Sequence, residues 1–268
     1  MEFVPFAFIQ DVAFRLPRNA MYILNQVSSH WSTEADFRLS HGLTKLTIIS
    51  ATDGIFYEAN MRSWNPLSQE NTVDIHSWET GSYELGVVEF GRSGLDGSRL
   101  NGTKTRLDEE SLERLLEIFR ETPFEITTVV LGDPHDEHVA DFNRLLRAIP
   151  SVRKVIAERQ RPESTLPMPS TCLQVDLPAF PESWETTVLE LLSNSRFCEL
   201  RFGAGENQFY EKVLQAIAER VKEEGRLVTL RIDESFGATA DVLGLHWTSN
   251  SPSSLPRSLH FVMRSWQK

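Results

Sequence analysis

Apolar residues recur at helical spacing close to the start of the chain. Four of them fall on one side of a helix with about 3.6 residues per turn: Phe8, Ile9, Val12 and Leu16. Pro5 suits the first turn of this helix, because its missing N–H belongs to the donors that have no partner there. Pro17 disfavours the α conformation in the residue before it. The pattern therefore predicts a helix from about residue 5 to residue 15.

A second amphipathic segment follows. Asn19 is a suitable N-cap for a helix that carries Ile23, Leu24 and Val27. Two helices of about a dozen residues are marginal in isolation. Their apolar sides must be buried, either by the rest of the chain or by a partner.

The second half of the chain is built from alternating apolar and polar residues. Period-two alternation is typical of half-buried strands. Three segments with this pattern align with one another: Leu173–Leu177, Cys198–Phe202 and Val228–Ile232. Three further strands are predicted at Val129–Leu131, Val152–Ile156 and Leu259–Met263. From Leu173 onward, the predicted strands begin 25, 30 and 31 residues apart, a spacing typical of a repeat array.

Amphipathic helices are predicted between these strands. They cover about residues 108–121, 136–149, 182–193 and 207–224, and Gly225 follows the last as a C-cap. Units of strand, loop and helix at this length resemble leucine-rich repeats in architecture, although they lack that family's regular asparagine after the strand. An α/β fold with a curved, leucine-rich-repeat-like solenoid is therefore expected. A doubly wound α/β sheet is the alternative, but its buried central strands would be continuously apolar.

The stretch between these two parts has a different character. Thr52-Asp53-Gly54 separates Leu46–Ile49 from Ile55–Tyr57, and Asp-Gly between apolar runs indicates a hairpin. Another strand is predicted from Tyr83 to Phe90. The expected organisation is a helical segment over 1–40 and an α/β body over 41–268. Within that body, residues 41–105 are rich in hairpins and loops, and residues 106–268 form the strand and helix repeats.

Composition narrows the classes of partner. The chain has 268 residues, of which 40% are hydrophobic and 24% charged, as in ordinary globular proteins. Its net charge of −11 disfavours nucleic acid as a partner. No apolar run approaches the ~18 residues of a membrane span, and the N-terminus lacks the basic start of a signal peptide. A cytoplasmic or nuclear protein without membrane contact is expected.

Candidate catalytic and metal motifs are weak. His135-Asp136-Glu137-His138 lacks the spacing of a helical zinc site and suits the start of a helix. Gly203-Ala204-Gly205-Glu206-Asn207 lacks the lysine and serine or threonine of a phosphate loop. No Gly-x-Ser-x-Gly turn occurs, and no serine or cysteine stands at recognisable spacing from a histidine. We expect no enzyme, no cofactor and no metal; a hydrolase or transferase would need a pocket with converging ionisable groups.

The N-terminal segment resembles an F-box. It has Val4-Pro5 where F-boxes have Leu-Pro, then the apolar helical positions, a Leu16-Pro17 break, and Val27-Ser28 ahead of Trp31. With a long variable body behind it, the segment is similar to the nematode families of F-box-related proteins. The resemblance implies a substrate receptor of a cullin (SCF-type) ubiquitin ligase.

That resemblance also implies which residues meet a partner. The N-terminal helices would bind a Skp-family adaptor through Pro5, Phe8, Ile9, Val12 and Leu16. An unknown protein substrate would bind the open face of the repeat sheet, where alternation places Gln174, Asp176, Glu199, Arg201, Thr229 and Arg231. The alternative is an interaction module without a ligase role, whose N-terminal helices only cap the solenoid.

Overall fold

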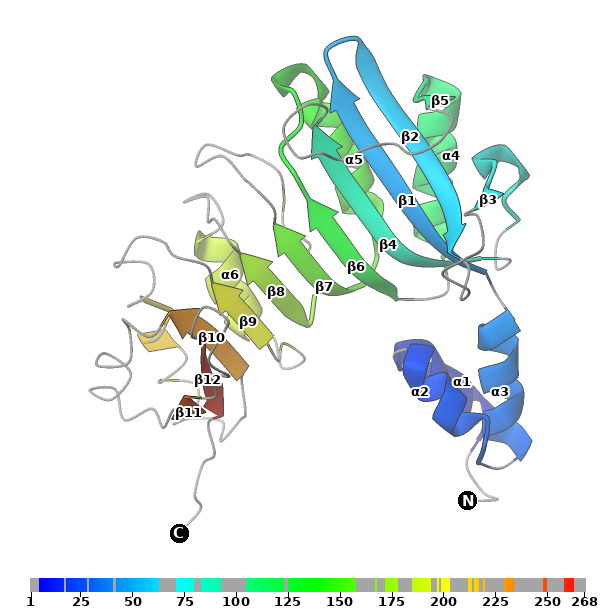
Figure 1. Ribbon diagram of the computed structural model, residues 1–268, viewed down its shortest axis with the longest axis vertical. Coiled ribbons are helices and arrows are strands. Elements are labelled where there is room, and N and C mark those ends of the chain that lie inside the picture. The colour runs from blue at the N-terminus through cyan, green and yellow to red at the C-terminus, as the bar shows by residue number, and fades with distance from the viewer. Residues whose placement is uncertain are drawn as a thin grey trace. The chain divides into compact units, whose positions relative to one another are not determined.

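The computed structural model divides into two compact units (Figure 1). The first comprises residues 1–129 and 134–151, and the second residues 130–133 and 152–268. The residues that the structure describes are 5–16, 18–27, 29–40, 42–62, 71–79, 83–92, 105–122, 125–157, 167, 172–177, 185–193, 197, 199–202, 212–213, 215–216, 219, 229–233, 248–249 and 258–262.

The first unit begins with three helices: α1 (Phe6–Arg15), α2 (Arg18–Leu24) and α3 (Ser29–Ser40). The predicted first helix is confirmed, and the Pro5 carbonyl accepts hydrogen bonds from the N–H groups of Phe8 and Ile9 at 2.9 and 3.2 Å. The Asn19 prediction was wrong, because α2 already begins at Arg18. The pattern did not predict α3, since polar Glu34 and Arg38 and small Ala35 occupy its buried side.

A hairpin opens the sheet of the first unit. β1 (Gly42–Ala51) and β2 (Gly54–Arg62) are antiparallel, and Ala51 faces Gly54 across the turn. Gly54 has a φ of 145°, a backbone conformation that L side chains rarely adopt. The hairpin predicted around Asp53 is therefore confirmed.

Further strands extend the hairpin on both sides. β4 (Tyr83–Arg92), another predicted strand, lies parallel to β1. β3 (Asn71–Thr72) and β5 (Thr105–Arg106) pair with β2. The order is β6-β4-β1-β2-β3, where β6 (Ile126–Leu131) contributes its first four residues to this unit.

Two helices cover one face of this sheet. Figure 1 shows both α4 (Glu109–Glu121) and α5 (Val139–Ala148) behind strands β1, β2 and β4. α4 starts where predicted: the Asp108 carboxylate accepts a hydrogen bond from the Ser111 N–H at 2.8 Å. Phe142 of α5 meets Phe90 of β4 edge to face, with ring centroids 5.3 Å apart.

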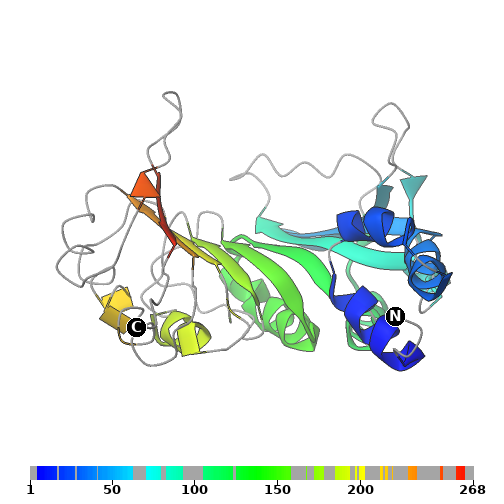
Figure 2. The same ribbon diagram turned by 90° about the horizontal axis from the view of Figure 1, so that it is seen from below.

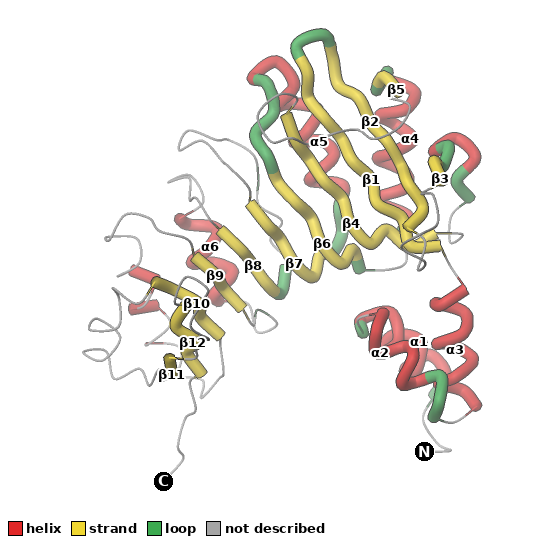
Figure 3. The backbone as a smooth tube through the Cα atoms, in the orientation of Figure 1, coloured by secondary structure: helices red, strands yellow, loops and turns green. Residues whose placement is uncertain are grey.

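The second unit contains four parallel strands in chain order. They are β7 (Val152–Ala157), β8 (Gln174–Leu177), β9 (Glu199–Phe202) and β10 (Thr229–Asp233), drawn as consecutive yellow strands in Figure 3. Their register places Val175 beside Leu200 and Leu200 beside Leu230, as the aligned sequence segments predict. Val175 and Leu200 are buried, so the predicted inward direction of these two side chains is confirmed.

The remaining elements depart in part from a regular repeat. β12 (Ser258–Val262) runs antiparallel to β10, and β11 (Thr248–Ser249) pairs with β12. α6 (Glu185–Ser193) confirms the helix predicted between β8 and β9. The helix predicted over 207–224 lies largely outside the described residues, although five residues within it are helical: 212, 213, 215, 216 and 219.

The fold is mixed α/β with open sheet edges, so the predicted class is confirmed. A solenoid of repeats stays a prediction. No helix in the described part of the chain combines the length and apolar character that crossing a membrane requires.

Candidate functional site

The three N-terminal helices share a small apolar core. It is formed by Ala13 of α1, Met21 of α2 and Ala35 of α3, with four partly buried side chains packed around it: Leu16, Ala20, Leu24 and Leu39. Ile9 is also buried, with 2% of its surface exposed. The apolar side of α1 is thus partly buried within the bundle of these three helices.

These helices also carry an exposed apolar surface. All large hydrophobic side chains that are exposed in the described part of the chain lie in or directly after α1, α2 and α3: Phe8 (54% exposed), Tyr22 (42%), Ile23 (68%), Val27 (48%) and Phe37 (50%). Exposed apolar residues are ordinary when scattered singly over a protein. Their concentration in this segment makes it the candidate site for contact with another molecule.

The residues predicted to bind an adaptor divide between this surface and the core. Pro5 and Phe8 are exposed, whereas Val12 and Leu16 are half-buried and Ile9 is buried. Val4, Pro17 and Ser28 of the F-box-like pattern lie outside the described residues, and Trp31 is half-buried.

Sequence reasoning did not assign Tyr22 or Phe37 to a partner surface. A usable signal existed for α2, because Met21 and Leu24 are three residues apart and share a helix face. Since those two side chains pack inward, the neighbouring Tyr22 and Ile23 are directed elsewhere. Phe37 had no such signal, because α3 itself was not predicted.

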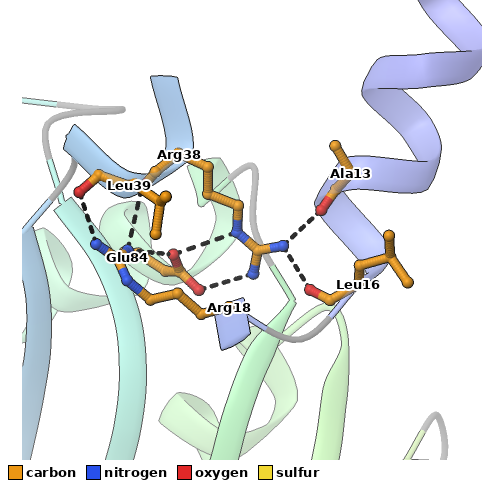
Figure 4. Close-up of polar contacts among 6 residues, drawn as sticks. All are labelled: Ala13, Leu16, Arg18, Arg38, Leu39 and Glu84. Atoms are coloured by element: carbon orange, nitrogen blue, oxygen red, sulfur yellow. Dashed lines mark hydrogen bonds and ion pairs between the residues drawn. The ribbon is translucent and has the colours of Figure 1, made fainter. Parts of the chain in front are cut away.

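A buried ion cluster joins the helices to the sheet (Figure 4). The Glu84 side chain of β4 is fully buried, and its carboxylate lies 2.8 Å from Arg18 Nη1 and 2.7 Å from Arg38 Nη2. Arg38 Nε donates a second hydrogen bond to the same carboxylate at 3.3 Å. Both guanidinium groups are themselves almost completely buried. Charges removed from water in this way are stable only when paired.

The two arginines also bind carbonyl groups at helix ends. Arg38 of α3 donates to the carbonyls of Ala13 and Leu16, at the end of α1, at 2.5 Å each. Arg18 of α2 donates to the carbonyls of Arg38 and Leu39, at the end of α3, at 3.0 and 2.9 Å. The last carbonyls of a helix lack intrahelical partners and carry partial negative charge. These carbonyls therefore add to the stabilisation that Glu84 gives the two guanidinium groups.

The predicted substrate-binding residues lie in two rows across the second unit's sheet. Backbone register aligns Gln174, Glu199 and Thr229 in one row, and Asp176, Arg201 and Arg231 in the other. Gln174, Asp176 and Glu199 are half-buried, and Asp176 forms an ion pair with Lys154 at 3.6 Å. The side chains of Arg201, Thr229 and Arg231 lie outside the described residues.

A serine and two histidines meet where β1 ends. Ser50 Oγ lies 2.8 Å from His138 Nδ1 and accepts a hydrogen bond from the His135 N–H at 2.8 Å. Arg92 Nε donates to His135 Nε2 at 3.3 Å. Burial, reinforced by the Arg92 charge, lowers the pKa of His135 below 6.5. Sequence spacing did not reveal this pairing, because it brings together residues 88 positions apart.

This cluster holds the start of α5 against the sheet. Ser50 has no exposed surface, so its hydroxyl is occupied inside the protein. Asp136–His138 forms a short 3₁₀ helix (η2) that leads into α5, which confirms the predicted helix start. Within the described residues, no group of three or more histidine, cysteine or acidic side chains is arranged to hold a metal ion.

Two other sequence motifs lie mostly outside the described residues. Cys172 is buried, whereas Cys198 is not described. The Gly203–Asn207 segment also lies outside them.

Comparisons of this chain with protein-family models, with curated proteins and with solved structures found no match.

Proposed function

We propose that this protein is a non-catalytic adaptor, a substrate receptor of a cullin (SCF-type) ubiquitin ligase. Its helices α1, α2 and α3 bind a Skp-family adaptor, and its α/β body holds the protein to be modified. The observation that carries the proposal is the concentration of exposed apolar side chains on these helices, from Phe8 to Phe37. The F-box-like pattern in the same segment names the class of partner.

The adaptor contact combines predicted and newly found residues. Phe8 and Pro5 keep the roles expected for them, and Tyr22, Ile23, Val27 and Phe37 join them. Val12 and Leu16 contribute from half-buried positions. Ile9 supports the contact from inside the bundle and does not touch the adaptor.

The size of the apolar surface is adequate for this role. Covering the exposed half of a large apolar side chain contributes roughly 1 kcal/mol. Association costs at least about 4 kcal/mol of lost rigid-body freedom. Most of the exposed side chains must therefore be covered together, which a specific protein partner achieves and an accidental contact does not.

The body presents the substrate. The proposed leucine-rich-repeat-like solenoid includes the parallel strands β7 to β10, and the two rows of positions from Gln174 to Arg231 are its proposed substrate-binding positions. The receptor needs no catalytic side chain, because it raises the local concentration of a target lysine near a ubiquitin-charged enzyme. Such a role belongs to the cytoplasm or nucleus.

Affinity capture with a purified Skp-family adaptor tests the proposal. The variant Phe8→Asp/Ile23→Asp places charges on two exposed positions and should reduce capture at least 10-fold. Ala140→Asp, at an exposed position of α5, is the matched control and should leave capture unchanged. Absence of capture by the wild-type chain, or equal capture by the double variant, would overturn the adaptor role.

The alternative is an interaction module whose N-terminal helices only cap the body. Burial of Ile9 and the attachment of Arg18 and Arg38 to Glu84 favour this alternative. The 54% exposure of Phe8 does not, because the outer face of a cap is polar. Equal adaptor capture by wild type and double variant, with deletion of residues 1–40 unfolding the body, would select the cap.

A further inference from the structure

We propose that Glu84 is a positioning residue for the apolar surface: α1, α2 and α3 keep their arrangement only while this strand carboxylate holds them on the sheet. The partner-binding helices are then part of the body's fold and not a separate module. That the apolar surface binds a partner rests on the proposed function. The role of Glu84 in positioning the three helices does not depend on it.

The helices have little packing of their own. Among their described residues, the buried hydrophobic side chains are Ile9, Ala13, Met21 and Ala35, and two of these four are alanines. The same segment exposes five large apolar side chains, four on the helices and one directly after α2. Helices of 10, 7 and 12 residues are each too short to be stable in water alone. Segments of about 40 residues rarely fold without a metal, disulfides or a partner surface.

The hydrogen bonds and ion pairs of Arg18 and Arg38 fix the arrangement of the three helices, which apolar packing alone does not. Each helix takes part in it: α1 through the carbonyls of Ala13 and Leu16, α2 through Arg18, and α3 through Arg38. Glu84 is the member that comes from the sheet, and it binds both arginines. Its side chain therefore connects α2 and α3 directly to β4, and α1 through Arg38.

The charge balance makes this role specific to a carboxylate. Two almost fully buried guanidinium groups share one carboxylate. Glutamine at position 84 has nearly the same shape, but its amide carries no charge and turns an NH₂ group toward donors. Both arginines would then lose their ion pair with position 84, which favours movement of their helices away from the sheet and toward water.

Neighbouring strand residues provide a matched control. Glu89 of the same strand forms an ion pair with Lys45 at 2.6 Å, and both side chains are partly exposed to solvent. Such a pair contributes little to a fold. Glu89→Gln therefore makes the same chemical change on the same strand without disturbing the buried cluster.

Amide hydrogen exchange on the full chain tests the proposal. Glu84→Gln should speed exchange in α1, α2 and α3 by about 100-fold, while β1, β4 and α4 remain within a few-fold of wild type. Glu84→Asp, which restores the charge on a shorter side chain, should recover part of the protection. Glu89→Gln should change neither region.

Two outcomes would overturn the proposal. The first is unchanged exchange in the helices of Glu84→Gln. The second is an equal loss of protection in the helices and in β1, β4 and α4, which would make Glu84 a residue of general stability. If Glu84→Gln yields too little folded protein, the variant Arg18→Gln, which removes the charge that α2 contributes to the cluster, is measured in its place. The same two outcomes would then overturn the proposal. Because the measurement needs no partner, its result is independent of adaptor capture.

Discussion

The Glu84 carboxylate of strand β4 and the Arg38 guanidinium of helix α3 form a buried ion pair of 2.7 Å that spans 46 residues of sequence. The pair fixes the last N-terminal helix to the sheet. Arg38 extends this attachment to α1 through the carbonyls of Ala13 and Leu16. The N-terminal helices and the sheet of the first unit are thereby parts of one framework.

A double-mutant cycle should detect this pair. Glu84→Gln and Arg38→Met should each lower the free energy of locally opening helices α1, α2 and α3 by about 3 kcal/mol, since each leaves a buried group without its partner. The double variant should lose less than the sum, with a coupling energy of at least ~1 kcal/mol. Amide hydrogen exchange in the four proteins measures the cycle.

The exposed pair of Lys45 and Glu89 is the control for that cycle. Because both side chains are partly exposed, its coupling energy should lie between about 0 and 1 kcal/mol. Equal coupling energies for the two pairs would contradict the structural role of Glu84 and Arg38.

Adjacent residues of α1 should respond in opposite ways to truncation. Ile9→Ala removes a buried side chain and should lower the free energy of unfolding by about 2 to 4 kcal/mol. Phe8→Ala removes an exposed side chain and should change it by less than about 0.5 kcal/mol, yet it should weaken adaptor capture. Denaturation curves and capture on the same samples separate the two roles; a larger stability loss for Phe8→Ala would place that side chain in the core.

Stability should depend on the protonation of His135. Burial and Arg92 lower the pKa of this imidazole in the folded chain below its value of 6.5 in an unfolded one. As the pH falls through 6.5, the unfolded chain takes up the proton first, so this contribution to stability is present above that pH and is lost below it.

The variant His135→Gln tests this dependence. Thermal melts between pH 7.5 and about pH 5 should show a shallower decline for the variant than for wild type. His30→Gln, which changes an exposed histidine on α3, should leave the decline unchanged. Parallel declines for wild type and His135→Gln would show that His135 is protonated without cost in the folded chain.

Gly54 should resist substitution because of its backbone. At a φ of 145°, an alanine would be strained, and its Cβ would lie 3.3 Å from Arg106 Nε. Gly54→Ala should cost about 1 to 3 kcal/mol of stability, measured by urea denaturation. Asp53→Ala in the same turn serves as the control, and an equal cost for both would show that the conformation at position 54 is not restrictive.

Much of the secondary structure could be predicted from local pattern. The helix after Pro5, the hairpin around Asp53 and the register of Val175 with Leu200 follow from spacing that repeats over a few residues. Such spacing follows from the local backbone geometry of a single helix or strand. The α/β class follows from the alternation of these elements.

The candidate site could be predicted only in part. The pattern assigned both Phe8 and Ile9 to a partner surface, but only Phe8 is exposed, whereas Ile9 lies inside the bundle. It left Phe37 unassigned, because α3 turns Ala35 and two charged residues inward and so lacks an apolar stripe. Which side of a helix is free depends on what packs against it, and local spacing does not contain that information.

The sequence by itself therefore determined most of the local elements and their order. Tertiary structure alone established that Arg18 and Arg38 share Glu84, that Ser50 meets His138, and that Ile9 is inside while Phe8 is outside. The reason is physical: ion pairs and hydrogen bonds between residues far apart in the chain depend on distances that only folding creates. The periodicity of apolar residues depends on the geometry of a single helix or strand, whereas the burial of a side chain depends on contacts among several elements.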